Sequence, residues 1–417
     1  MPIQFLAAVA HEGLPTWVPN SLRDPWRNVT VLVSLVVLLF IKRYLNGFLN
    51  PATRDMHGRV IIMTGATSGI GAAAARDLAR RGAQLVLLTR LPPSNPFLAD
   101  YIGELRETTN NNLIYAEQVD LTSLHSIRQF ATKWIDNAPP RRLDMIILCA
   151  DTLTPPGSKR VQTAEGIEET WMVNFLANFH LLGILSPGIR AQPFDRDVRV
   201  IIPTCSSYIG APSLSEELDK NKWSPGKAYG RSKLAMLVFG QAFQKHLATY
   251  KRPDGLPMTS RVIFVDPGLC RTPGMRRWLS RGTLWGLFCY VGLYFVPWFF
   301  LKSAEMGAQS ILYAVLESSM VRGEGGQLIK ECQMVDFART DIKDEGIAKK
   351  LWEASDKLIE QTEKEQAALR NLEKKDQEAK EKQKKEAEQA EEIEALVDAI
   401  KKGKEAEKKP SRRKNKK

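Results

Sequence analysis

A glycine-rich turn between a buried strand and a helix constrains the fold of this chain more than any other feature. Residues 58–64, GRVIIMT, form the short β-branched apolar run expected of a strand buried in a parallel sheet. The turn GATSGIG follows at once, and the alanine-rich residues 72–81 then favour a helix. A strand, a glycine turn and a helix in this order provide the context that a dinucleotide-binding loop requires.

The three glycines of the turn have separate expected roles. Gly65 permits the tight turn, Gly69 lets the backbone approach a pyrophosphate, and Gly71 allows the helix to pack closely on the strand. The phosphates would then lie at the helix N-terminus, where free N–H groups and the helix dipole favour negative charge. The residues between the glycines that we expect to contact the cofactor are Thr67, Ser68 and Ile70.

Strand-like and helix-like segments alternate regularly after this turn. The expected strands are 60–64, 84–89, 113–119, 145–148, 198–203 and 261–265, and the expected helices are 72–81, 99–109, 123–137, 164–185 and 227–249. Alternation of this kind predicts an α/β fold, in which a doubly wound parallel sheet is covered by helices on both faces.

Tyr229 and Lys233 are four residues apart in a helix-like segment, so they share one helix face. An ammonium group beside a phenol favours the ionised phenol, and we therefore expect Lys233 to lower the pKa of Tyr229. Such a pair alone is also common on solvated helix faces. Combined with the glycine turn, it indicates a tyrosine that exchanges protons beside a bound dinucleotide.

The spacing GxxxGxG together with Tyr229 and Lys233 resembles the short-chain dehydrogenase/reductase family, over about residues 54–358. Three segments are similar to the retinol-dehydrogenase branch of that family: VDLTSLHSIRQF at 119–130, AYGRSKLA at 228–235 and EMGAQSILY at 305–313. The resemblance implies a Rossmann-type sheet of about seven strands, with the last strand near 327–330, and activity as an NAD(P)-dependent oxidoreductase.

The resemblance also implies catalytic roles. Ser207 would hydrogen-bond the substrate oxygen, although its neighbour Ser206 is easily confused with it. Tyr229 would exchange the proton, and Lys233 would assist it and bind the nicotinamide ribose. Asn174 matches the helix asparagine that completes a water-linked proton relay.

Further cofactor contacts follow from the same resemblance. Arg90 comes directly after the second strand, where a guanidinium could bind a 2′-phosphate, so we expect NADP(H) to be preferred and NAD(H) to be possible. A solvated loop residue is the alternative reading of Arg90. Asp120 matches a position near the adenine, or acts only as an acid at a helix N-terminus. Pro267 and Gly268 fit the loop beside the nicotinamide, with Thr272 placed to meet its carboxamide.

One segment departs from the family. Where the family usually has Asn-Asn-Ala-Gly, this chain has Leu148-Cys-Ala-Asp151, and only the alanine is shared. The change could weaken cofactor binding or mark an inactive member. Activity remains our expectation, because the serine, tyrosine, lysine and asparagine are all present.

Residues 1–50 are expected to form a membrane-anchor region. The uncharged apolar run Val29–Ile41 is followed by Lys42-Arg43, which favours a cytosolic core. The run is shorter than the ~20 residues that cross a bilayer upright, so it is either a signal anchor or a helix embedded in one leaflet. A cleaved signal peptide and a buried soluble helix are the alternatives, and residues 2–10 could also join the membrane surface.

A second uncharged run, Thr283–Leu301, lies where the family has a substrate lid. A membrane span there would separate the last helix and strand from the fold. We therefore expect an apolar lid that dips into the bilayer surface, or a purely internal lid. The aromatic residues expected at the interface are Trp285, Tyr290, Tyr294 and Trp298.

The chain ends in a charged region. Residues 359–417 are rich in Lys and Glu, and 360–402 are expected to form a solvated helix or a weak coiled coil. The basic end, 401–417, is expected to be a disordered tail, with anionic lipid as a second reading and nucleic acid as a third. Much of the net charge of +12 comes from this end, so no nucleic-acid binding by the core is expected.

The five cysteines are scattered and odd in number, which favours reduced thiols facing the cytosol, and no metal site is visible. The expected function is that of a membrane-associated NADP-dependent oxidoreductase that interconverts a lipophilic ketone or aldehyde and its alcohol. The expected location is the endoplasmic reticulum or a lipid-droplet surface, and a homodimer is possible. The alternative is a non-catalytic dinucleotide-binding scaffold that recruits partners through its charged tail.

Overall fold

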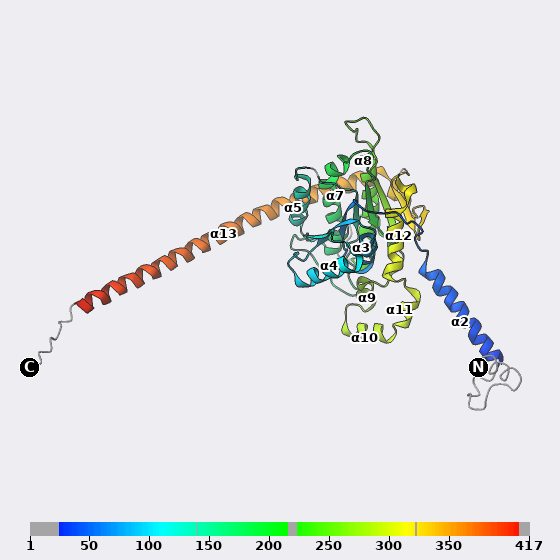
Figure 1. Ribbon diagram of the computed structural model, residues 1–417, viewed down its shortest axis with the longest axis horizontal. Helices are drawn as coiled ribbons and strands as arrows, with labels where there is room; N and C mark the ends of the chain where they lie inside the picture. Colours follow the sequence, from blue (N-terminus) through cyan, green and yellow to red (C-terminus); the bar gives the residue numbers. More distant parts are fainter. Residues whose placement is uncertain (1–24, 140, 216–222, 322, 408–417) are drawn as a thin grey trace, which may run out of the picture. The chain divides into compact units, whose positions relative to one another are not determined.

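The computed structural model describes residues 25–139, 141–215, 223–321 and 323–407, and its centre is an eight-stranded sheet in the order β3-β2-β1-β4-β5-β6-β7-β8 (Figure 1). The strands are β1 (Val60–Thr64), β2 (Gln84–Thr89), β3 (Ile114–Gln118), β4 (Met145–Leu148), β5 (Arg199–Pro203), β6 (Arg261–Asp266), β7 (Gln327–Lys330) and β8 (Gln333–Val335). All neighbours are parallel except β7 and β8. The predicted Rossmann-type sheet is confirmed. The sequence did not predict β8, because this strand has only three residues and none of them is buried.

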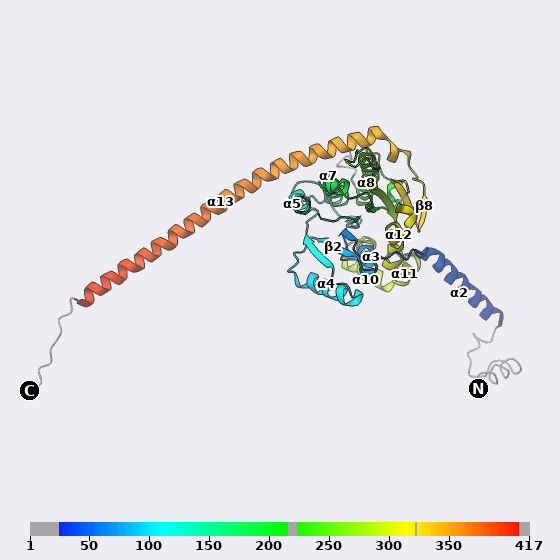
Figure 2. The same ribbon diagram turned by 45° about the horizontal axis from the view of Figure 1, so that its top comes forward.

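Helices form one layer on each side of the sheet (Figure 2). One layer contains α3 (Gly69–Arg80), α4 (Pro96–Thr109) and α12 (Ala304–Leu316), and the other contains α5 (Leu124–Ile135), α7 (Ala177–Arg190) and α8 (Pro225–Ala248). Polar caps fix where several of them begin: the Asn95 side chain accepts the amide of Phe97, and Ser123 accepts that of Ser126.

The helix expected at 164–185 begins and ends later than predicted. Its first turn, α6 (Glu169–Trp171), starts after Glu168, whose side chain accepts the Trp171 amide. A π-helical turn, η2 (Met172–Leu176), leads into α7. Single π turns inside helices are rare and occur often at functional sites. Sequence periodicity cannot reveal one, because it changes the register by a single residue.

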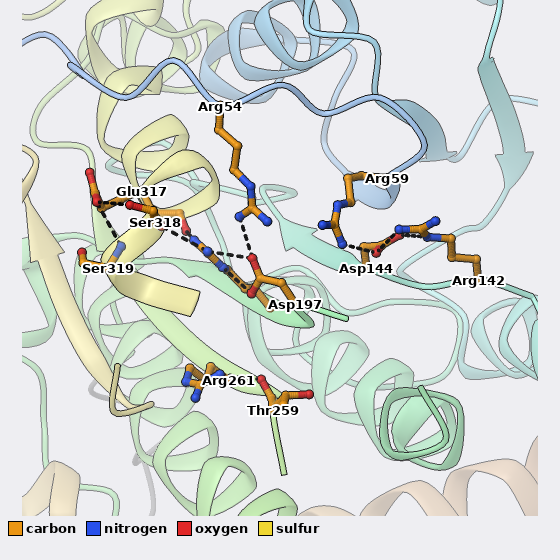
Figure 3. Close-up of polar contacts among 12 residues, drawn as sticks. Arg54, Arg59, Arg142, Asp144, Asp197, Thr259, Arg261, Glu317, Ser318 and Ser319 are labelled. Atoms are coloured by element: carbon orange, nitrogen blue, oxygen red, sulfur yellow. Dashed lines mark hydrogen bonds and ion pairs between the residues drawn. The ribbon is translucent and has the colours of Figure 1, made fainter. Parts of the chain in front are cut away.

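Ion pairs with buried carboxylates hold the amino ends of the central strands β4 and β5 (Figure 3). Asp144, just before β4, accepts hydrogen bonds from Arg59 at 3.0 Å, from Arg142 at 2.6 Å and from the amide of Val60 at 2.9 Å.

Asp197, just before β5, binds Arg54 at 2.6 Å and Arg199 at 2.7 Å. Arg199 is fully buried, and it also donates to the carbonyl oxygens of Ala314 and Glu317 at the end of α12. Burial alone would raise the pKa of Asp197, but the hydrogen bonds and charges of Arg199 and Arg54 outweigh it, so that pKa lies below its ordinary value. This pair therefore stabilises the fold above the ordinary carboxyl pKa, and the contribution is lost as the pH falls through the lower folded-state value.

Contacts divide the chain into two units, between Asp356 and Lys357. In the second unit the predicted charged segment 360–402 is helical, as part of α13 (Glu345–Glu407), and exposed Lys–Glu pairs such as Lys364–Glu360 lie four residues apart along it. Residues 401–407, which we expected to belong to a disordered tail, are instead the last residues of α13. Residues 2–10, for which we expected membrane contact, and residues 408–417 lie outside the described residues.

Replacing Asp197 with alanine should lower the free energy of unfolding by about 3–5 kcal/mol, because it leaves Arg199 buried without its partner carboxylate. Thermal unfolding of the full chain in detergent at pH 7 measures the effect. Glu360→Ala, which removes an exposed ion pair, is the matched control and should leave the melting temperature unchanged. Equal melting temperatures for the two variants would show that the buried pair does not stabilise the sheet.

Candidate active site

A cavity of about 1030 Å³ opens at the carboxyl ends of the strands. Its walls come from the glycine turn after β1 and from the segments that follow β4, β5 and β6, together with α8 and an apolar lid. The lid comprises α9 (Pro273–Leu279), α10 (Leu284–Gly292) and α11 (Phe295–Phe300). The carboxyl ends of the strands are where open α/β sheets bind their ligands.

The glycine turn allows the backbone to come very close to the end of β4. Gly65 has a φ of +66°, and a Cβ on it would lie 2.6 Å from the amide nitrogen of Ala150. A Cβ on Gly71 would collide with the carbonyl oxygen of Gly65. Only glycine fits either position. The first amides of α3 therefore remain open to the cavity, an arrangement that fits the pyrophosphate of a dinucleotide.

The predicted tyrosine and lysine lie on one face of α8 and line the cavity. The Lys233 nitrogen lies 5.5 Å from the centroid of the Tyr229 ring. Ser207 lines the same cavity, and its hydroxyl lies 2.8 Å from the sulfur of Cys205. The neighbouring Ser206 donates to Asp266 at 2.9 Å, so its hydroxyl is engaged in holding the loop after β6. Because the hydroxyl of Ser206 is engaged by Asp266, Ser207 is the serine whose hydroxyl can contact a substrate.

A carboxylate that the sequence did not assign lies between the tyrosine and the lysine. The Tyr229 hydroxyl donates to Oδ2 of Asp151 at 2.6 Å, and the Lys233 nitrogen lies 3.1 Å from the same oxygen. Burial, followed by the charge of Asp151, raises the pKa of Tyr229 well above its ordinary value. The expectation that Lys233 lowers the pKa of Tyr229 is therefore wrong for this structure. Burial would lower the pKa of Lys233, but the charge and hydrogen bond of Asp151, together with the nearby Cys205 and Cys149, outweigh burial and raise that pKa.

Asn174 lies in the π-helical turn and is buried behind the cavity wall. Its side chain accepts the amide of Thr152 at 2.8 Å, donates to the carbonyl oxygen of Thr152 at 3.0 Å, and reaches Ser232 at 3.3 Å. It therefore fixes the segment after β4 against α8. Asn178, one turn on, donates to the carbonyl oxygens of Val173 and Asn174 within its own helix.

The other predicted cofactor contacts fall into two groups. Gly65, Ser68, Gly69, Ile70, Gly71, Pro267, Gly268 and Thr272 line the cavity together with the tyrosine and lysine. Thr67, Arg90 and Asp120 do not line it. Thr67 and Arg90 are exposed, the latter directly after β2, and Asp120 accepts both the amide and the hydroxyl of Thr122 in a local turn.

The sequence did not assign several of the residues that line the cavity to the site. Asp151 was noticed only as a departure from the family pattern. Tyr44 and Leu45, at the end of α2 (Pro25–Asn46), follow the basic pair that we read as the end of a membrane segment. Their contribution to the cavity depends on tertiary contacts alone. In those contacts the Lys42 ammonium donates to the carbonyl oxygens of Trp298, Phe299 and Leu301 at the end of α11.

Comparison with known proteins agrees with this geometry. The family model described as short chain dehydrogenase matches residues 59–281, more than half of the chain. An uncharacterized oxidoreductase, pbr1, of Schizosaccharomyces pombe is 40% identical over 88% of this chain and 97% of its own length. The polyprenol dehydrogenase of Mus musculus is 29% identical over 78% of this chain and 90% of its own. Human retinol dehydrogenase 11 is 28% identical over 79% and 96%. The predicted retinol-dehydrogenase-like branch is thus confirmed.

Gly71→Ala should weaken NADPH binding at least tenfold, because its Cβ displaces the Gly65 carbonyl and with it the phosphate-binding turn. Titration of the purified protein by nucleotide fluorescence measures the dissociation constant. Gly103→Ala is the matched control: this glycine lies within α4, a Cβ on it meets nothing within 4 Å, and NADPH binding should not change. Equal affinities in the two variants would remove the turn from the binding site.

Proposed function

The chain belongs to the short-chain dehydrogenase family and is an NAD(P)-dependent dehydrogenase or reductase, and from this premise we propose that it interconverts a lipophilic ketone or aldehyde and its alcohol at a membrane surface, with NADP(H) as its cofactor. Among the named relatives are a polyprenol dehydrogenase and a retinol dehydrogenase, whose names refer to lipophilic alcohols.

The observation that carries this proposal is that one cavity joins the phosphate-binding turn, the reactive side chains and the apolar lid. The polar side chains of Ser207, Tyr229 and Lys233 line one part of the cavity. The lid and the residues beside it contribute apolar side chains, from Met275, Trp278, Leu279, Phe300 and Leu301. A ligand with a single oxygen and a long hydrocarbon body satisfies both ends.

The side chains divide the reaction among them. A nicotinamide held in this cavity would supply or accept the hydride at the substrate carbon. Ser207 donates a hydrogen bond to the substrate oxygen and holds it near Tyr229, whose hydroxyl exchanges the proton with that oxygen. Asn174 acts from behind the wall by fixing the segment that carries Asp151.

The preference for NADP(H) rests on Arg90. It follows β2 directly, and it is exposed and thus free to turn toward a 2′-phosphate. A carboxylate at this place would instead favour the ribose hydroxyl of NAD(H). Because the cavity wall lacks Arg90 in this structure, the guanidinium must move to make the contact.

Membrane association is supported by two apolar surfaces. The 18-residue window of α2 from Val29 to Asn46 is unburied and apolar enough for a membrane helix. Because Lys42 and the residues after it contact the core, the part left for the membrane is the run Val29–Ile41, which spans about 20 Å at 1.5 Å per residue and therefore suits one leaflet. The segment Glu169–Arg190 has a similar composition, but it is largely buried as a core helix. On the lid, no residue of α10 is buried, and Leu284, Trp285 and Phe288 are 86%, 73% and 68% exposed.

The two surfaces meet where Lys42 caps α11, so a membrane that holds α2 also lies beside the lid. We propose that the core faces the cytosol, as the basic pair after the apolar run suggests, and that the membrane is the endoplasmic reticulum or a lipid-droplet monolayer.

A non-catalytic scaffold is the second candidate function. Asp151 favours it, because a carboxylate that binds both Tyr229 and Lys233 differs from the glycine usual in the family. Binding of NADPH without turnover of any lipophilic carbonyl compound would support this candidate and contradict the enzyme proposal.

Tyr229→Phe should reduce NADPH oxidation with lipophilic aldehydes and ketones by about 10²–10⁴-fold, because the proton donor is lost, while leaving NADPH binding intact. Tyr250→Phe, whose ring packs against Arg190 outside the cavity, is the control and should retain full activity. The same assay with NADH compares the two cofactors. Undiminished turnover in the Tyr229→Phe variant would refute the role of the tyrosine.

Replacing Leu284, Trp285 and Phe288 together with serine should leave the protein bound to membranes through α2 but raise KM about tenfold for a long-chain aldehyde in vesicles, equal to about 1.4 kcal/mol. Turnover of a short, water-soluble aldehyde should not change. Leu369→Ser with Leu372→Ser, exposed apolar positions of α13, is the control.

Deletion of residues 29–41 should release the protein into the soluble fraction. Persistent membrane binding of the deletion variant would reject α2 as the anchor.

A further inference from the structure

The segment after β4 places a carboxylate against both members of the tyrosine–lysine pair. Oδ2 of Asp151 lies 2.6 Å from the Tyr229 hydroxyl and 3.1 Å from the Lys233 nitrogen, so one oxygen atom contacts both groups. The other hydrogen bond of the Lys233 ammonium goes to the carbonyl oxygen of Pro203 at 3.3 Å. The lysine therefore reaches the tyrosine hydroxyl through Asp151.

Backbone anchors on both sides hold this carboxylate in place. The amide of Ala150 donates to the Thr64 hydroxyl at 3.1 Å, and both backbone groups of Thr152 bind the Asn174 side chain. Asp151 is not among the residues with a positive φ, so an aspartate is accommodated there without strain. Its side chain is 26% exposed and lines the cavity. These contacts describe a fixed position that faces the substrate space.

We propose that Asp151 is the proton bridge of this active site, carrying the proton between Lys233 and Tyr229. The inference rests on the proposed oxidoreductase function and adds a residue to its proton path. In this arrangement the lysine supplies the proton to the phenol through the carboxylate, and its charge is largely neutralised by that carboxylate.

The proton balance of the reduction follows the contacts. As hydride adds to the carbonyl carbon, the O–H bond of Tyr229 breaks and its proton bonds to the substrate oxygen. The Lys233 ammonium then gives a proton to the Asp151 carboxylate, the carboxyl group passes a proton to the Tyr229 phenolate, and the resulting lysine amine takes one from water. The sum consumes one hydride from the reduced dinucleotide and one proton from solvent, and oxidation runs the same steps in reverse.

The groups that face the Tyr229 hydroxyl determine how it titrates. They are Asp151 from the β4 segment, Lys233 from α8 itself, and Cys205 after β5, whose sulfur lies 3.8 Å away. Cys149, before Asp151, is kept protonated because burial raises its pKa to about 12. The carboxylate is therefore the negative charge nearest to the phenol, and its removal should favour the phenolate.

Asp151→Asn tests the bridge, since it keeps the size of the side chain and removes the charge. We expect kcat for aldehyde reduction at pH 7 to fall at least tenfold, because Lys233 can no longer reprotonate Tyr229. We also expect the alkaline limb of the pH profile to move to lower pH by at least one unit, because reduction needs the protonated phenol and its pKa falls. NADPH affinity should change less than threefold. Asp254→Asn, in an exposed loop, is the control and should match the wild type.

A second measurement does not depend on turnover. NMR of the full chain carrying isotope-labelled tyrosine, with Tyr229→Phe to assign the signal, should show the Tyr229 pKa lower in Asp151→Asn than in the wild type. Wild-type turnover with an unchanged kcat, pH profile and phenol titration in Asp151→Asn would overturn the bridge alone. Faster turnover and at least tenfold tighter NADPH binding in Asp151→Asn or Asp151→Gly would show that Asp151 obstructs the site, and would also overturn it. Absence of turnover in the wild type would reject the oxidoreductase function and the bridge together.

Discussion

The close backbone contact between the glycine turn and the end of β4 is the constraint on which the rest of the site depends. Side chains at Gly65 or Gly71 would collide with Ala150 or with the turn itself, so the two segments can meet only through glycine. This contact leaves the first amides of α3 open to the cavity. It also sets where the chain emerges from β4, and therefore where Asp151 presents its carboxylate. The proposed phosphate binding and the proposed proton transfer thus share one structural cause.

The parts of the fold that the sequence predicted are those governed by local periodicity and glycine chemistry. The alternation of apolar strands and helices predicted the parallel sheet, and the strand at 327–330 was placed with its observed bounds. The late start of the helix at Glu169 and its π-helical turn were missed because they depend on local hydrogen bonds rather than on a repeated pattern. Strand β8 was missed because it is short and exposed. The apolar run 29–41 lies within helix α2, which continues through polar residues at both ends.

The site shows the same division between local pattern and tertiary contact. The four-residue spacing of Tyr229 and Lys233 was enough to place both on one helix face, as the structure has them. Spacing could not show that a third group, 78 residues before the tyrosine in sequence, lies between them. Nor could spacing show that the tyrosine is buried, and burial, followed by the charge of that carboxylate, raises the pKa of Tyr229. A pair of residues read without its surroundings therefore gave the correct positions and the wrong electrostatics.

The apolar end of the cavity connects this chemistry to the membrane. Tyr44 and Leu45 of α2 line the cavity together with Phe300 and Leu301 of the lid, and Lys42 joins the two elements by capping α11. An ammonium that satisfies the free carbonyl groups of a helix end stabilises that end, so the anchor helix contributes directly to the position of the lid. Apolar side chains of α2 and of the lid thus line the same cavity as the tyrosine. If the proposed membrane association holds, a lipophilic substrate could reach that cavity from the lipid without crossing water.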